Sequence, residues 1–194
     1  MAAEKDIRLI VGLGNPGADC VHTRHNVGFL AVDELAEALG ARVWTLKHGC
    51  MIARTTCAGR EVLLAKPQSF MNASGGPVSK LMRAERIVPA ELLVIHDEVD
   101  LESGVVRTRF GGGLNAHNGL RSLKDKLGTP DFWRVRTGIG RPPGKMDVAT
   151  YVLRQLRARC SMSCSIRPRA LPGQHKPRSA NGQARPPGRG MAPI

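Results

Sequence analysis

The residues best suited to chemistry lie in a few polar segments of the chain. His25 stands in the run Thr-Arg-His-Asn just before a predicted helix, and a histidine in a polar loop can act as a general base because its ordinary pKa lies near 6.5. Asp97 lies in the run His-Asp-Glu-Val-Asp, directly after the most apolar short segment. Two interpretations of this acidic run stay open: its three carboxylates could hold Mg²⁺, or Asp97 could orient a histidine.

Three asparagines occupy loop positions where a peptide could bind. Asn15 follows a glycine turn, Asn72 lies at a strand-to-helix junction, and Asn118 follows the run Gly-Gly-Gly-Leu-Asn-Ala-His. A side-chain amide both donates and accepts hydrogen bonds, which suits it to a peptide backbone. Beside a candidate histidine base, these three amides indicate an acyl-transfer site.

The segment Gly-Leu-Gly-Asn-Pro-Gly over residues 12–17 matches the letters of the dinucleotide-binding motif GxGxxG. That motif needs a helix that begins inside the glycine loop and an acidic residue at the end of a second strand. Here Pro16 removes an amide donor, the helix is predicted to begin only near Asn26, and Asp33 and Glu34 lie inside that helix. The sequence therefore favours a tight turn, and we expect no cofactor.

Four arginines lie two residues apart on two predicted strands: Arg107 and Arg109 on one, Arg134 and Arg136 on the other. Such pairs can neutralise phosphates along a nucleic-acid backbone, and the alternative is a solvated sheet face. The chain has only four Phe, two Trp and one Tyr, so base stacking is not expected to dominate binding. A partner recognised through its phosphates and shape fits this composition better.

The elements that must position these residues alternate between strands and helices. Apolar β-branched runs predict strands over residues 7–12, 43–44, 51–57, 62–66, 92–96, 105–110 and 133–139. Apolar stripes at helical spacing predict helices over residues 26–39, 74–85 (capped by Ser74), 116–127 and 147–156. This alternation predicts a single α/β domain with a three-layer core.

The basic charge of the chain is unevenly distributed. Of 194 residues, 29 are Lys or Arg and 16 are Asp or Glu, a formal net charge of +13. Residues 157–194 hold eight of the basic residues, no acidic residue and many prolines, so we expect a catalytic domain over residues 1–156 and a disordered basic tail over 157–194. No apolar run is long enough for a membrane span, and five cysteines without a CxxC pair are typical of a cytoplasmic protein with reduced thiols.

Six segments occur in the order seen in bacterial-type peptidyl-tRNA hydrolases, and the chain resembles that family over about residues 5–156. They are Gly12–Gly17, Thr23–Phe29, Lys66–Gly75, His96–Asp100, His117–Leu120 and Arg134–Pro142. The resemblance implies a monomer with a mixed twisted sheet between helices. It also implies hydrolysis of the ester that joins a peptide to the 3′ ribose of tRNA, without a metal.

The resemblance further implies roles for the matching residues. His25 would activate water for attack on the ester carbonyl, Asp97 would orient and polarise His25, and Asn118 would bind substrate or the attacking water. The remaining cleft residues would hold the peptide backbone or wall the cleft: Asn15, Asn72 and Phe70. The tRNA acceptor stem and its phosphate would face Arg107, Arg109 and Arg136.

The chain departs from the family pattern at three places. Cys20 stands where a tyrosine is usual, which is expected to alter the cleft wall, and Ala116 replaces the glycine before His-Asn-Gly, where a methyl group restricts φ. After Leu156 the Arg- and Pro-rich tail stands in place of the usual C-terminal helix. An alternative function is therefore that of a catalytically impaired or silent tRNA-binding relative.

Overall fold

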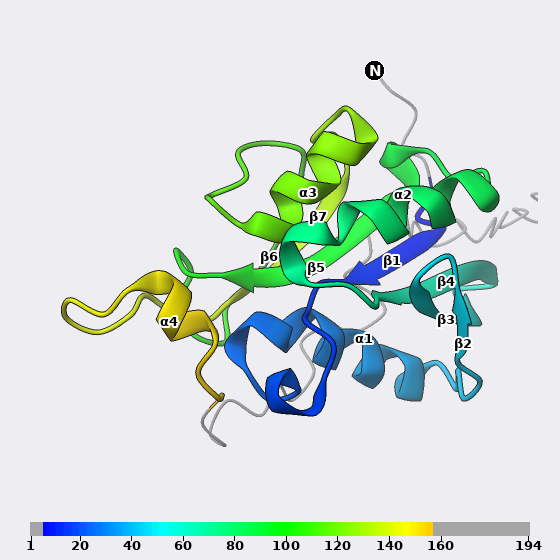
Figure 1. The fold of residues 1–194 in the computed structure, drawn as a ribbon. Coiled ribbons are helices and arrows are strands. Elements are labelled where there is room, and N and C mark those ends of the chain that lie inside the picture. The colour runs from blue at the N-terminus through cyan, green and yellow to red at the C-terminus, as the bar shows by residue number, and fades with distance from the viewer. Residues whose placement is uncertain (1–5, 157–194) are drawn as a thin grey trace, which may run out of the picture.

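Seven strands form one mixed sheet at the centre of the structure, and helices cover both of its faces (Figure 1). The computed structural model describes residues 6–156, so the predicted tail over 157–194 lies outside the described residues. The strand order across the sheet is β2-β3-β4-β1-β5-β7-β6. The strands are β1 (Leu9–Gly12), β2 (Thr45–Lys47), β3 (Cys50–Cys57), β4 (Arg60–Pro67), β5 (Leu92–Glu98), β6 (Val106–Phe110) and β7 (Trp133–Gly138).

The inner strands of the sheet are parallel and the outer ones antiparallel. β1 pairs in parallel with β4 and β5, and β5 pairs in parallel with β7. β3 runs antiparallel to β2 and β4, and β6 runs antiparallel to β7. Every residue of β5 is buried, as expected for a central strand covered on both faces. The predicted α/β fold with a mixed sheet is confirmed.

The helices give the molecule its three layers. They are α1 (Val27–Ala38), α2 (Gly75–Ala84), α3 (Asn118–Leu127) and α4 (Val148–Val152). Figure 1 shows α2 and α3 on one side of the sheet and α1 on the other. Neighbouring residues of β5 enter different cores: Val94 packs in the cluster with Leu81 and Leu123, and Ile95 packs in the cluster with Val32. The alternation of side chains along a strand thus divides the core into two.

The glycine-rich loop after β1 serves close packing between a strand and a helix. A Cβ atom on Gly12 would overlap the backbone carbonyl of Gly28 in α1, and one on Gly14 would lie 2.6 Å from the Phe29 ring. The helix itself begins at Val27, after two short 3₁₀ turns, η1 (Ala18–Cys20) and η2 (Arg24–Asn26). Since no helix begins inside the glycine loop, the geometry needed for a dinucleotide pyrophosphate is absent there.

Several element ends differ from the predicted ones for local reasons. α3 begins two residues later than predicted because the His117 ring caps it, accepting from the amides of Gly119 and Leu120. α4 is short: it starts after Asp147, whose carboxylate accepts from the Thr150 amide, and it ends before the chain turns to pair with another loop. Other elements begin or end a few residues away from the predicted positions. For example, β2 covers residues 45–47, whereas a strand was predicted over 43–44.

The side-chain cap predicted for α2 does not form. Ser74 occupies the position before the helix, but its side chain makes no capping bond. Its hydroxyl donates to the carbonyl of Met71 in the turn η3 (Met71–Ala73), at 2.9 Å. The preceding turn therefore gains the hydrogen bond that the helix was expected to have.

The parallel strands bring the polar loops to one edge of the sheet. β1, β4 and β5 all end at this edge. Asn15 lies in the loop after β1, Phe70 follows β4, and Asp97 is the second-last residue of β5. In open α/β sheets, ligands bind outside the carboxyl ends of parallel strands. Across the described part of the chain, none of the helices combines the length and apolar character that crossing a bilayer requires.

Candidate active site

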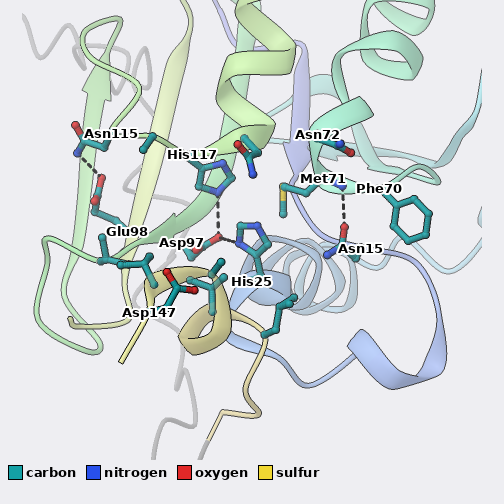
Figure 2. Close-up of a pocket in the computed structure, with 17 residues that line it drawn as sticks. Asn15, His25, Phe70, Met71, Asn72, Asp97, Glu98, Asn115, His117 and Asp147 are labelled. Atoms are coloured by element: carbon teal, nitrogen blue, oxygen red, sulfur yellow. Dashed lines mark hydrogen bonds and ion pairs between the residues drawn. The ribbon is translucent and has the colours of Figure 1, made fainter. Parts of the chain in front are cut away.

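A cavity of about 540 Å³ opens at this carboxyl edge, within the usual size range of small-ligand sites. The six residues predicted for catalysis and peptide binding all line it: Asn15, His25, Phe70, Asn72, Asp97 and Asn118. Figure 2 shows five of these side chains around the cavity: they come from the loop after β1, the turn η2, the segment that follows β4, and the end of β5. The sixth, Asn118, stands at the start of α3. The structure therefore brings together residues up to about a hundred positions apart in sequence.

At the centre of the cavity, the Asp97 carboxylate joins two histidines (Figure 2). His25 Nδ1 lies 2.9 Å from Asp97 Oδ1, and His117 Nε2 lies 3.0 Å from the same oxygen. The side chain of Asp97 is 3% exposed, and that of His25 is 12% exposed. The carboxylate is thus shielded from water, whereas His25 keeps contact with the cavity.

The hydrogen bonds fix where each imidazole carries its proton. An ionised carboxylate only accepts, so His25 Nδ1 and His117 Nε2 must both donate to Asp97. His117 Nδ1 in turn accepts from the amide of Gly119 at 3.1 Å, so it holds no proton. His117 is therefore neutral. In the neutral form of His25 this bond places the proton on Nδ1 and leaves the lone pair on Nε2, which no described residue engages.

The environment of Asp97 keeps it ionised. Burial alone raises the pKa of this carboxyl, but the contacts with His117 and then with His25 lower it by more, so that the pKa lies far below its ordinary value. An Asp97 carboxylate that stays charged at physiological pH can stabilise positive charge on His25. This is the arrangement that a histidine base requires when it takes a proton from water.

His96, next to Asp97, is a third histidine at the site but lies outside the cavity. Its ring is 2% exposed and packs edge-on against His117, with 5.0 Å between ring centroids. Nδ1 donates to the backbone carbonyl of Asp97 at 2.6 Å, and Nε2 has no hydrogen-bond partner among the described residues. Burial, and then the neighbouring His117, lower the pKa of His96 to about 3, so this histidine stays neutral.

The cluster of His25, Asp97 and His117 has the residue types of a metal site, since one ligand atom from each lies within 4.8 Å of the others. However, His25 Nδ1 and His117 Nε2 are both hydrogen-bonded to Asp97 Oδ1. The second nitrogen of His117, Nδ1, caps α3. A metal ion would have to break both bonds to Asp97 to enter. The donor set therefore fits a hydrogen-bonded base better than a metal centre.

The carboxylates at the end of β5 and just beyond it do not gather around a common cation position either. Asp97 turns to the histidines, whereas Glu98 accepts from Arg136 Nε at 3.0 Å and from Asn115 Nδ2 at 3.1 Å. Asp100 forms an ion pair with Arg141. Because all three carboxylates are already engaged, Asp97 by histidines and the other two by arginines and the shared Asn115 amide, the structure does not favour the Mg²⁺ interpretation of this segment.

Asn15 is held firmly, and in a way that determines which half of its amide can reach a ligand. The backbone of Asn15 exchanges two hydrogen bonds with the buried Asn26 side chain, both at 2.8 Å. Asn15 Oδ1 accepts from the Met71 amide at 2.7 Å (Figure 2). Among the described residues nothing engages the Asn15 NH₂ group, so it offers the cavity a donor and no acceptor.

The other three predicted cleft residues lie on the cavity rim. Phe70 is 70% exposed, which is unusual for an aromatic ring on a folded domain. Asn72 and Asn118 are exposed, and within residues 6–156 their side chains make no hydrogen bond to the protein. An exposed ring and two unengaged amides are well placed to bind an extended peptide.

The predicted basic residues lie on one face of the antiparallel pair formed by β6 and β7, outside the cavity. In this pair Arg107 lies opposite Arg136 and Arg109 lies opposite Arg134, and directly opposed residues share a face. Arg107 and Arg109 are exposed, and Arg136 is half-buried beside Glu98. This leaves three guanidinium groups near the surface.

Arg134 differs from the other three arginines and does not lie on a solvated face as expected. It is 2% exposed, and its guanidinium donates to the backbone carbonyls of the glycine loop over residues 111–113. Burial, followed by the charges of Arg109 and Arg136, lowers the pKa of Arg134. Arg134 thus holds the loop that leads to His117 and is not free for a phosphate.

Sequence reasoning missed three contributors to the site. His117 was noted only as part of a motif, although a polar residue directly before a helix is a cap signal. Asn26 was treated as the start of a helix, whereas its side chain fixes the loop of Asn15. The third is the wall formed by α4, where Val148, Val152 and Leu153 line the cavity. Cys20, expected to alter the cleft wall, is not among the lining residues.

Comparison with known proteins gives a consistent result. A family model described as "Peptidyl-tRNA hydrolase" matches residues 9–165. The peptidyl-tRNA hydrolase of Frankia alni is 53% identical over 150 residues, which cover 77% of this chain and 76% of that protein. That of Nocardia farcinica is 51% identical over 151 residues, covering 77% and 78%.

Solved structures agree with the sequence relatives. A crystal structure of the peptidyl-tRNA hydrolase from Acinetobacter baumannii superposes with a TM-score of 0.73 and 40% sequence identity, covering 79% of each chain. A point variant of the enzyme from the same organism gives a TM-score of 0.74 at 38% identity, covering 82% of each chain. With its fold, its motifs and its relatives in agreement, the chain belongs to the peptidyl-tRNA hydrolase family.

Proposed function

We propose that this protein hydrolyses the ester bond between peptide and tRNA in peptidyl-tRNA, releasing free peptide and free tRNA. One observation carries the proposal: His25, fixed through Nδ1 by the buried ionised Asp97, lines a cavity that also carries amide groups, and no described residue engages its Nε2. No observation favours the alternative of a catalytically silent tRNA-binding relative. The tail that motivated this alternative lies outside the described residues.

The reaction begins when His25 Nε2 removes a proton from a water molecule in the cavity. The resulting hydroxide oxygen attacks the ester carbonyl carbon, and the carbonyl oxygen becomes an oxyanion. Asp97 stabilises the His25 imidazolium through the hydrogen bond at Nδ1. Collapse of the tetrahedral intermediate breaks the bond to the ribose 3′-oxygen, and the imidazolium returns its proton to that oxygen.

Side-chain amides on the cavity wall supply the binding contacts for this reaction. The Asn15 NH₂ group is restricted to donating, because its oxygen is bound to the Met71 amide, so it suits a peptide carbonyl. Asn118, at the first position of α3, lies beside His117 and can donate to the oxyanion or hold the attacking water. Asn72 and Phe70 flank Met71, whose amide is bonded to Asn15, and they hold the peptide at the cavity rim.

The tRNA contacts the paired strands β6 and β7 in this proposal. Arg107 and Arg109 are exposed on the edge strand, and Arg136 lies across from Arg107. Three guanidinium groups on one face suit the acceptor stem and its phosphate, because phosphate contacts position a nucleic acid without reading its sequence. Their binding to tRNA is expected to weaken as salt rises.

Turnover of peptidyl-tRNA by purified protein tests the proposed base. His25→Asn removes the accepting nitrogen and is expected to lower kcat by at least about a hundredfold. His48→Asn is the matched control, because His48 is exposed in the β2–β3 turn. Turnover by the His25→Asn variant equal to that of the control would refute the assignment of the base.

We infer further that the protein acts as a monomer in the cytoplasm, where peptidyl-tRNA arises during translation. The residues proposed for catalysis and peptide binding all belong to one chain, so the proposed site needs no residue from a second copy. Light scattering of the purified protein checks this: a dimer whose dissociation abolishes turnover would contradict it.

A further inference from the structure

The wall of the cavity formed by α4 has little core packing of its own. α4 has five residues, and of these only Val152 is buried. Val148 and Leu153, which line the cavity, are 47% and 53% exposed. Apolar contacts this sparse contribute little to holding a five-residue helix in place, because short helices depend on tertiary contacts. Another interaction must fix the position of this wall.

The chain beyond α4 pairs with the loop that precedes His25. Thr23 and Gln155 form an antiparallel bridge. The Arg24 amide donates to the carbonyl of Arg154 at 3.1 Å, and the Leu156 amide donates to the carbonyl of His22 at 2.8 Å. Figure 1 shows the same proximity, with α4 beside the turns that lead into α1. The wall and the loop of the catalytic base are therefore joined directly.

The Arg24 side chain reinforces this junction from the loop side. One guanidinium nitrogen donates to the carbonyls of Arg154 and Gln155, at 3.2 and 3.0 Å. The guanidinium carbon lies 4.3 Å from the centre of the Tyr151 ring, and Tyr151 Oη donates to the Ile139 carbonyl at 2.8 Å. A single planar group thus holds the aromatic ring of α4 and the two carbonyls that follow the helix.

We propose that Arg24 is a positioning residue for peptide binding: its guanidinium fastens the α4 wall of the cavity to the loop that carries His25. This inference rests on the proposed function. Arg24 does not line the cavity, so it acts through Tyr151 and the backbone at 154–155. Its loss leaves His25 bonded to Asp97 but lets the wall move, which weakens peptide binding more than it slows the chemical step.

Steady-state kinetics with peptidyl-tRNA test the proposal. Arg24→Ala is expected to raise KM about tenfold while kcat changes by less than about threefold, and Arg24→Lys to fall between it and the wild type. Tyr151→Leu should raise KM similarly, and the double variant should be no worse than the worse single one. Arg42→Ala is the charge-matched control, since Arg42 is exposed and makes no ion pair among the described residues.

Two kinetic outcomes would overturn the proposal. If the effects of Arg24→Ala and Tyr151→Leu on KM add in full, the two residues do not act through one shared junction, which the proposal requires. If Tyr151→Leu has no effect and the loss in Arg24→Ala grows with falling salt, Arg24 binds a tRNA phosphate.

Amide hydrogen exchange on the free protein tests the junction without any turnover. The Leu156 amide, which donates to His22, is expected to exchange about tenfold faster in Arg24→Ala than in Arg42→Ala. Unchanged exchange would overturn the inference even if the enzyme is active. Faster exchange in a protein that has no peptidyl-tRNA turnover would support the junction and refute the proposed function, so the two failures are distinguishable.

Discussion

Replacement of the buried His96 should change how the stability of the protein depends on pH. In the folded state burial, with His117 beside the ring, lowers the pKa of His96 to about 3, whereas in an unfolded chain a histidine has a pKa near 6.5. Below pH 6.5 the unfolded state therefore binds a proton that the folded state does not. The contribution of His96 to stability is fully present above pH 6.5 and is lost as the pH falls toward 3.

The size of this effect follows from proton linkage. Between pH 7 and pH 5 the unfolded chain takes up most of one proton at this position, and the folded protein takes up almost none. Linkage converts this difference into a loss of about 2 kcal/mol in the free energy of unfolding. Asp97 does not contribute in this window. Its contacts with the two histidines hold its pKa below the ordinary value, so its contribution to stability is lost only at more acidic pH.

Denaturant unfolding followed by tryptophan fluorescence measures the effect, because Trp44 and Trp133 pack against the core. His96→Asn keeps a donor near the Asp97 carbonyl but removes the titrating ring, so the variant should lose about 2 kcal/mol less than the wild type between pH 7 and pH 5. His48→Asn, at an exposed position, should behave as the wild type does. The reasoning is refuted if His96→Asn and the wild type lose equal stability over this range.

Further substitutions test separate parts of the structure. Asp97→Asn is expected to lower kcat by about a hundredfold to ten-thousandfold, because an amide can donate to His25 and favour the wrong tautomer; a steady-state kcat close to that of the wild type would contradict this. Gly75→Ala places a methyl group on the backbone carbonyl of Ser122 in α3 and should destabilise the fold by about 1–3 kcal/mol, whereas Gly76→Ala, with open space around it, should be neutral or stabilising in thermal unfolding. Ala116→Gly relieves a positive φ of 59° and should stabilise the protein by up to about 1 kcal/mol; a lower Tm would count against the strain at this residue.

The fold could be predicted largely from local sequence patterns. The run over residues 92–96 is apolar throughout, and β5 is buried at every position. The helix over 26–39 has a regular apolar stripe, and α1 matches it within a residue at each end. Patterns of this kind survive because they reflect burial of a whole face. Ends set by one side chain, such as the cap of α3 by His117, were predicted less well.

The members of the site were easier to predict than their contacts. Asn15, His25 and Asp97 stand at strand or helix ends, which is where the sequence placed them. The bond from the Met71 amide to Asn15 spans 56 positions and decides that Asn15 donates to the cavity. The burial of Arg134 under a glycine loop depends on tertiary structure in the same way. No spacing within the sequence encodes contacts of this range.

Asp97 has a structural consequence that its proposed role of orienting His25 alone does not require. One of its oxygens accepts from His25, which precedes α1, and from His117, which caps α3. These two helices cover opposite faces of the sheet (Figure 1), so a single carboxylate at the end of β5 joins both outer layers. A buried charge is costly unless it is fully hydrogen-bonded. The need to satisfy Asp97 therefore draws both loops to the same point, and the geometry of the base is set by the same contacts that close the edge of the fold.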